Sequence, residues 1–302
     1  MKVYYPEGSF VHKGRKIWYD YLLKGFEQAK VKVEISESMQ KESMDEEGRH
    51  GVSISAIDIE VGNKRFRVWY DWGNFLNAKL ELIKKDDLYY KIQCDKKYLD
   101  WGIIPIGQVV TSLDFINDLE RMRKIKDTKD YKYDIIGVFR ATNYDLRIDS
   151  VRLIRKMRGI RSLVGVAPWW REKRTVPEDI KIEKLKYMEH LELQCRSKIC
   201  LGLAGNVEGG FAWRDMEILG MGCCLASFEN RCVLPGDYNY FTKKCQITIK
   251  DDKSDLIDKI NYYLKHDDER EEITRRGLKY YNDWLTPAAM VRNIIDTIWR
   301  KV

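Results

Sequence analysis

The stretch KICLGLAGNVEGGFAWRDMEILGMGCCLAS, residues 198–227, decides the fold. It begins with a buried apolar run and continues through a glycine-containing loop into a short helical pattern. A glycine ends that pattern, and a second run of small and apolar residues follows. An order of strand, loop, helix and strand is typical of a parallel β-sheet with helical crossovers.

The same rhythm extends to both sides of this stretch. Apolar runs predict strands at 133–139, 160–167, 198–204, 223–227 and 246–250. Helical periodicity lies between several of them, most clearly at 144–157 and 183–193. Strands alternating with helices of this length predict a doubly wound, Rossmann-like domain.

The first half of the chain begins in a similar way, with a strand at its start and a helix over 14–30. The runs 52–61 and 64–72 alternate like strands and predict a hairpin turned at Gly62-Asn63. We therefore expect an α/β fold of two Rossmann-like domains, the first over 1–130 and the second over 131–302. The charged stretch 121–134 is the expected linker. The helix opened by Pro287 is a candidate to pack back on the first domain.

The composition is that of a globular protein. The chain has 302 residues, of which 44% are hydrophobic and 33% charged. No apolar run approaches the roughly 18 residues of a membrane helix, and the start has no apolar signal region, so we expect a cytoplasmic protein without a transmembrane segment. The seven cysteines lack zinc or redox spacing and predict reduced, buried thiols.

The net charge of +7 raises the alternative of nucleic-acid binding. The densest basic stretch is RLIRKMRGIR, residues 152–161, which places Arg152 and Arg155 at helical spacing. Basic and acidic residues are interspersed along the chain, which favours a solvated helix face and no nucleic-acid partner.

The loop and helix at the centre of the opening stretch form a candidate anion site. A helix that starts near Phe211 directs its first amides toward the loop that holds Gly209 and Gly210. Arg214 in the first turn opposes the helix dipole by about 0.3 to 1 kcal/mol, whereas one charge-assisted hydrogen bond to a phosphate contributes about 1.5 to 3 kcal/mol. Glu217 follows on the same face and could accept ribose hydroxyls. An ordinary surface ion pair between Arg214 and Glu217 remains the alternative.

These residues also carry a resemblance to a known family. The segment 197–227 resembles the donor site of GT-B glycosyltransferases, most of all exostosin-like and CgeB-like enzymes. In these families a glycine loop and an R-x-x-E-x-x-x-x-G motif precede a small-residue strand. Arg214, Glu217 and Gly222 match that motif, and the resemblance covers about residues 133–300.

The resemblance implies that Arg214 contacts the diphosphate of a nucleotide sugar and that Glu217 contacts its ribose. It implies a UDP sugar as donor and co-substrate, a glycan acceptor and no further cofactor. Glu208 and Glu217 lie nine residues apart, one more than in the E-x7-E pair of retaining relatives. That departure favours an inverting transfer.

Two further residues are expected at the donor site. Arg140 ends the strand at 133–139, at the sheet edge where parallel sheets bind ligands, and Trp169 follows the next strand and could stack on the base. No D-x-D triplet occurs, and Asp58-Ile59-Glu60 is the nearest approach. Because divalent metals need closely spaced oxygen ligands, we expect a metal-independent reaction with arginines neutralising the diphosphate.

An inverting transfer needs a base that takes the proton of the acceptor hydroxyl. Asp71 is the first candidate, because it lies at a strand end between Tyr70 and Trp72. Glu7 and His12, in the loop after the first strand, are rivals.

The sequence thus predicts a glycosyltransferase that uses a nucleotide diphosphate sugar. The alternative is a non-catalytic nucleotide- or glycan-binding protein on the same fold, and the oligomeric state is left open.

Overall fold

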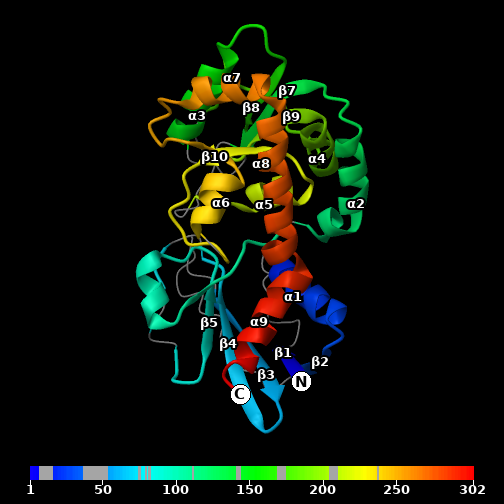
Figure 1. Ribbon diagram of the computed structural model, residues 1–302, viewed down its shortest axis with the longest axis vertical. Coiled ribbons are helices and arrows are strands. Elements are labelled where there is room, and N and C mark those ends of the chain that lie inside the picture. The colour runs from blue at the N-terminus through cyan, green and yellow to red at the C-terminus, as the bar shows by residue number, and fades with distance from the viewer. Residues whose placement is uncertain are drawn as a thin grey trace.

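The structure is a computed structural model, which describes residues 1–6, 16–36, 54–73, 76–78, 80, 83–110, 112–140, 144–168, 175–203, 210–236 and 238–302. Its strands form two separate sheets, one in each of two α/β domains. The domains lie one above the other in Figure 1, with the first domain below. The predicted fold class is confirmed.

The first domain holds a six-stranded sheet in the order β2-β1-β3-β4-β5-β6. Five strands run parallel to one another, whereas β3 runs antiparallel to both of its neighbours. The predicted hairpin is confirmed, because Val61 pairs with Lys64 around Gly62, whose φ is 59°. The strands are β1 (Lys2–Pro6), β2 (Lys32–Ser36), β3 (Ile54–Val61), β4 (Lys64–Asp71), β5 (Leu88–Lys91) and β6 (Ile104–Pro105).

The last helix of the chain completes the first domain. Helix α9 (Pro287–Trp299) returns from the second domain and packs along α1 (Lys16–Gln28), as Figure 1 shows. The two helices approach closely at Gly25, where a β-carbon would collide with the carbonyl group of Pro287. Tyr21 on α1 also donates a hydrogen bond to the backbone oxygen of Leu285, at 2.6 Å. The last helix therefore packs back on the first domain, as the sequence suggested.

The second domain holds a fully parallel sheet in the order β11-β10-β9-β7-β8. Its strands coincide closely with the predicted runs: β7 (Tyr133–Arg140), β8 (Ser162–Ala167), β9 (Ser197–Leu201), β10 (Leu225–Phe228) and β11 (Ile247–Ile249). The helices of this part of the chain are α3 (Tyr144–Arg155), α4 (Tyr187–Cys195), α5 (Trp213–Gly220), α6 (Tyr238–Lys244), α7 (Leu256–Lys265) and α8 (Asp267–Tyr280), which continues into the π-helical turn η4 (Tyr281–Leu285).

Helix α2 (Leu113–Asp127) lies in the part of the sequence expected to end the first domain, yet it packs beside α4. Arg121 of α2 forms an ion pair with Glu192 of α4, at 2.6 Å. In Figure 1 the two helices lie next to each other at the side of the second domain. The chain thus reaches the second domain before the end of the charged stretch 121–134, the first half of which belongs to α2.

The carboxyl ends of the two sheets face each other. Beyond β5, Gln93 donates a hydrogen bond to the backbone oxygen of Phe211, at 2.8 Å. Val233, beyond β10, donates to the backbone oxygen of Cys94, at 2.7 Å. One apolar core runs from Tyr21 and Tyr90 in the first domain to Leu219 and Leu225 in the second. The described segments that follow β5 and β10 therefore meet at the junction of the two domains.

Two sequence-based expectations about the whole chain can be compared with the structure. All seven cysteines are free and buried, as predicted. None of the helices within the described ranges combines the length and the apolar character that a membrane crossing requires.

Candidate functional site

The candidate site lies where the strand order of the second sheet reverses. Strand β7 pairs with β8 on one side and with β9 on the other, so the connections that leave β7 and β9 diverge at this point. Open parallel sheets bind ligands at the carboxyl ends of the strands at such a switch point. A cavity of about 460 Å³ occupies this position. We call it the donor pocket, after the donor site that the sequence resemblance leads us to expect in this region. Its lining comes from the ends of β7 and β8, the segment 184–190 and the start of α5.

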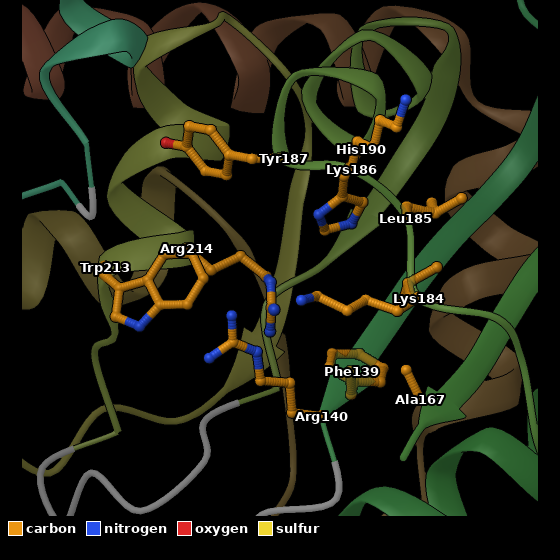
Figure 2. Close-up of a pocket in the computed structure, with 11 residues that line it drawn as sticks. Phe139, Arg140, Ala167, Lys184, Leu185, Lys186, Tyr187, His190, Trp213 and Arg214 are labelled. Atoms are coloured by element: carbon orange, nitrogen blue, oxygen red, sulfur yellow. The ribbon is translucent and has the colours of Figure 1, made fainter. Parts of the chain in front are cut away.

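Three cationic side chains converge on the donor pocket. Figure 2 shows Arg140 from β7, Lys184 from the segment before α4 and Arg214 from α5 pointing toward one another. Within the described part of the chain, none of the three forms an ion pair or a side-chain hydrogen bond. Uncompensated like charges repel, so this arrangement favours an anionic ligand between them. The predictions for Arg140 and Arg214 concern this same cavity.

Aromatic rings hold the guanidinium of Arg214. The Arg214 guanidinium carbon lies 5.0 Å from the ring centre of Trp213 and 5.4 Å from that of Phe139. Its Nε is buried and has no hydrogen-bond partner among the described residues. Burial lowers the pKa of Arg214, and repulsion by Arg140 lowers it further, whereas Glu217 and Asp215 oppose that shift. An anion in the pocket would balance the charge of Arg214 and accept a hydrogen bond from its Nε–H group.

A second buried arginine fixes the frame of the donor pocket. Arg147 on α3 donates to the backbone oxygens of Arg140 and Leu203, each at 3.0 Å, and so ties the ends of β7 and β9 together. Its guanidinium carbon lies 5.2 Å from the ring centre of Phe139. Burial lowers the pKa of Arg147 to about 9, and Arg214 contributes to that shift. Phe139 thus has a guanidinium within cation–π range from each of two elements.

Helix α5 begins and ends as the motif predicts. Asp215 accepts a hydrogen bond from the backbone N–H of Ala212, at 2.8 Å, which caps the first turn. Burial raises the pKa of Asp215 to about 8. At the other end Gly222 has a φ of 71° and donates to the backbone oxygen of Leu219, so it stops the helix in the left-handed conformation.

Glu217 is placed differently from the ribose contact that the resemblance implies. Its side chain is buried, with the residue 1% exposed, and it does not line the donor pocket. Tyr187, which does line the pocket, donates a hydrogen bond to the carboxylate of Glu217 at 2.5 Å. The carboxylate therefore holds Tyr187 in place, and it forms no ion pair with Arg214.

Of the glycine and tryptophan residues predicted at the site, the structure describes only Gly210. Gly210 has a φ of 87° and lies against the backbone of Glu229 and Asn230, so a side chain there would be strained. Gly209 and Trp169 lie outside the described residues.

Asp71, the first candidate for the base, lies in a closed ion pair. It is the last residue of β4, as predicted, but it is 0% exposed. Its carboxylate accepts hydrogen bonds from Lys91 at 2.8 Å, Tyr89 at 2.9 Å and the backbone N–H of Gly73 at 2.8 Å. Its neighbours Tyr70 and Trp72 stack on each other in the core. A carboxylate enclosed in this way cannot reach an acceptor hydroxyl, so the geometry argues against Asp71 as the base.

The rival candidates Glu7 and His12 lie outside the described residues. They follow β1, whose carboxyl end belongs to the sheet edge that faces the second domain.

The carboxylates nearest to a D-x-D pattern are both engaged. Asp58 accepts hydrogen bonds from Arg65 and Arg67, and Glu60 accepts one from Tyr4. Across the ranges that the structure describes, no group of three or more histidine, cysteine or acidic side chains could hold a metal ion.

The basic stretch 152–161 begins in the last turn of α3, and its first two arginines make contacts within the fold. Arg152 pairs with Asp179 at 2.8 Å, and Arg155 donates to the backbone oxygen of Val164 at 2.7 Å. These contacts agree with the expectation of an ordinary helix face for Arg152 and Arg155.

Sequence reasoning missed several residues of the donor pocket, among them Lys184, Tyr187, His190 and Trp213. Lys184 lies in the segment between β8 and α4, where no motif distinguishes it from other lysines, whereas Tyr187 and His190 belong to α4. The Nε2 atom of His190 is buried without a hydrogen-bond partner among the described residues. Burial, and next the charge of Arg214, lower the pKa of His190 to about 3. The imidazole is therefore neutral beside the three cations.

A comparison with models of protein families shows to which family the chain belongs. The family model described as glycosyl transferase-like matches residues 122–296, which include every described residue of the donor pocket. The chain belongs to this glycosyl transferase-like family. A comparison with curated proteins gives no significant match for this family member.

Several solved structures are similar to this glycosyl transferase-like chain. HepE from Anabaena, crystallised in complex with UDP, is 12% identical with a TM-score of 0.45, and the match covers 66% of this chain and 58% of that one. A glycosyltransferase from Rickettsia africae is 12% identical with a TM-score of 0.47, and the match covers 70% of this chain and 62% of that one. The match therefore spans about three fifths of the length of these proteins.

Proposed function

We propose that the protein is a glycosyltransferase that binds a nucleotide diphosphate sugar in the donor pocket and transfers the sugar to a hydroxyl of a glycan acceptor. The observation that carries the proposal is the convergence of Arg140, Lys184 and Arg214 at the switch point of the parallel sheet. A diphosphate is the group of a nucleotide sugar that would compensate these charges. A UDP sugar is the expected donor because of the sequence resemblance.

The cations account for the chemistry of the leaving group. As the bond between the anomeric carbon and the diphosphate breaks, negative charge grows on the phosphate oxygen. Guanidinium and ammonium groups that are already in place stabilise this charge in the transition state. We therefore propose a reaction in which side chains, and not a divalent metal, neutralise the departing diphosphate.

Arg147 and Tyr187 act as positioning residues in this proposal. Arg147 holds the ends of β7 and β9 at the correct separation, and Glu217 orients Tyr187 at the wall of the pocket. Glu217 is assigned this role in place of a direct contact with the ribose, because its carboxylate is buried behind the lining.

The proposed transfer inverts the anomeric centre in one displacement. The acceptor oxygen attacks the anomeric carbon, the nucleoside diphosphate leaves, and a base accepts the hydroxyl proton. With Asp71 enclosed, Glu7 and His12 are the proposed bases. They follow β1, which ends at the edge of the first sheet that faces the second domain.

The proposal is tested by removing one cation of the donor pocket. Arg214→Ala should weaken UDP binding, measured by calorimetry, by about 10- to 100-fold, because one charge-assisted hydrogen bond is lost. Hydrolysis of a panel of UDP and GDP sugars should fall with it. Arg158→Ala is the matched control, since Arg158 is exposed in the turn that follows α3 and forms no ion pair or side-chain hydrogen bond with the described residues.

Unchanged UDP affinity in the Arg214→Ala variant would overturn the assignment of the donor pocket. Binding of UDP by the wild type, with no turnover of any sugar donor, would instead identify a non-catalytic nucleotide-binding protein.

A further inference from the structure

A second cavity lies at the junction of the two domains, beside α9. It has a volume of about 490 Å³, within the range of ligand sites, and we call it the α9 groove. Its walls come from β6, the segment 233–236 beyond β10, η4 and α9. It shares no lining residue with the donor pocket, so it needs an explanation of its own.

One polar stripe of α9 forms a wall of the groove. Arg292, Asn293, Asp296 and Arg300 recur at the spacing of one helix face and line the cavity. The opposite stripe of the helix, which includes Val291, Ile294 and Ile298, is buried in the core. The wall from residue 289 to residue 300 is about 16 Å long at 1.5 Å per residue. The groove is therefore an elongated polar surface on a firmly packed helix.

The charges of the α9 groove cancel. Two guanidinium groups, on Arg292 and Arg300, stand against two carboxylates, on Asp283 and Asp296. Asp283 pairs with Lys279 at 2.7 Å, whereas Arg292 and Asp296 form no ion pair or side-chain hydrogen bond with any described residue. The groove therefore lacks the excess positive charge of the donor pocket and offers donors and acceptors side by side.

The remaining lining of the groove is mostly apolar. It includes the aliphatic side chains of Leu234 and Pro235 and the aromatic ring of Trp284. The indole of Trp284 lies against Gly236, whose φ is 78°, and a β-carbon at Gly236 would approach the ring to 2.7 Å. Glycine at this position lets the ring lie flat against the backbone, which fixes its orientation.

We propose that the α9 groove binds a neutral oligosaccharide, at a site separate from the donor pocket. A sugar hydroxyl both donates and accepts hydrogen bonds, so it is matched by carboxylates, guanidinium groups and an amide in alternation. The C–H faces of sugar rings are apolar and pack on an aromatic ring and aliphatic side chains. The choice of a glycan over other polyhydroxylated ligands rests on the proposed function, for which the groove would hold part of the acceptor chain.

The test uses the full chain and an array of neutral gluco-, galacto- and manno-oligosaccharides of three to eight units. The wild type should bind at least one of them. For the tightest binder, titrated by calorimetry, Asn293→Ala combined with Asp296→Ala should weaken the affinity at least tenfold. Arg158→Ala should match the wild type. Arg292→Ala, which removes an exposed side chain, provides a second variant if the double variant does not fold.

Three results would overturn the inference: no neutral oligosaccharide binds, the groove variants bind as tightly as the wild type, or only anionic oligosaccharides or peptides bind. Hydrolysis of UDP sugars, measured on the same proteins, separates this inference from the proposed function. Loss of oligosaccharide binding with intact hydrolysis in the groove variants supports both. A wild type that binds oligosaccharides but no UDP sugar leaves the groove assigned and the proposed function wrong.

Discussion

His190 shows how one side chain of the donor pocket links stability to pH. Its pKa is lowered to about 3 by burial, so the folded protein keeps the imidazole neutral. The unfolded chain binds a proton at this position near pH 6.5. Protons are therefore taken up on unfolding in mild acid, and the free energy of unfolding falls as the pH decreases from about 7 toward 3.

His190→Gln should remove this part of the acid sensitivity. Between pH 7 and pH 5 the wild type should lose up to about 2 kcal/mol more stability than the variant, as measured by urea unfolding. His266→Gln, at an exposed histidine of the same domain, serves as the control and should behave like the wild type. An equal loss of stability in the wild type and in the His190→Gln variant would show that His190 does not stay neutral.

Prediction at the residue scale went furthest where one short segment carries the pattern. The end of α5 at Gly222 and the position of Arg214 beside the pocket follow from residues within a few positions of one another. Lys184 and His190, which line the donor pocket, and Arg147, which supports its frame, could not be found in this way, because they come from separate elements. The enclosure of Asp71 could not be foreseen for a similar reason: its partner Lys91 lies on the neighbouring strand, and only the pairing of β4 with β5 brings the two together.

At the scale of elements, the contact between α1 and α9 depends on one glycine. A β-carbon at Gly25 would collide with the backbone of Pro287 and approach a methyl group of Val291. Gly25→Ala should therefore force the helices apart and destabilise the protein by about 1 to 3 kcal/mol, despite the better helix propensity of alanine. Chemical unfolding measures the change.

Glu27→Ala is the matched control for Gly25→Ala, because Glu27 is exposed on the same helix. It should change stability by no more than about 0.5 kcal/mol. A Gly25→Ala variant that is as stable as the wild type would mean that α9 does not sit this close to α1.

The elements of the second sheet were predictable and those of the first were less so. Each parallel strand of the second domain is buried on both faces and reads as a continuous apolar run. The first sheet contains β3, which is antiparallel to its neighbours, and the very short β6, so its order follows from long-range pairing that local pattern does not reveal. Likewise, the charge of the stretch 121–134 indicated a linker, although α2 buries Phe115 and Met122 in the core.

On the scale of the whole molecule, the two sheets share one core. Leu285, between α8 and α9, is fully buried and packs where a β-carbon on Gly107 would collide with it. Because this core crosses the junction, we expect both domains to unfold in a single transition. Tryptophan fluorescence and circular dichroism should give coincident denaturation curves.

Leu285→Ala should shift both of these curves together, by about 2 to 5 kcal/mol, because it leaves a cavity in the shared core. Two separate transitions, or loss of structure in one domain alone, would contradict a shared core.

The return of α9 also has a consequence for the order in which the protein is made. The strands of the first sheet and α1 leave the ribosome early. Helix α9, which packs beside α1 on the first domain, is formed by residues 287–299 and is made almost last. Since synthesis proceeds at roughly 5 to 20 residues per second, the first domain waits about 10 to 40 seconds with apolar surface uncovered. During that interval the nascent chain would be a natural client for chaperones, and the amino-terminal domain would be the last to complete its folding.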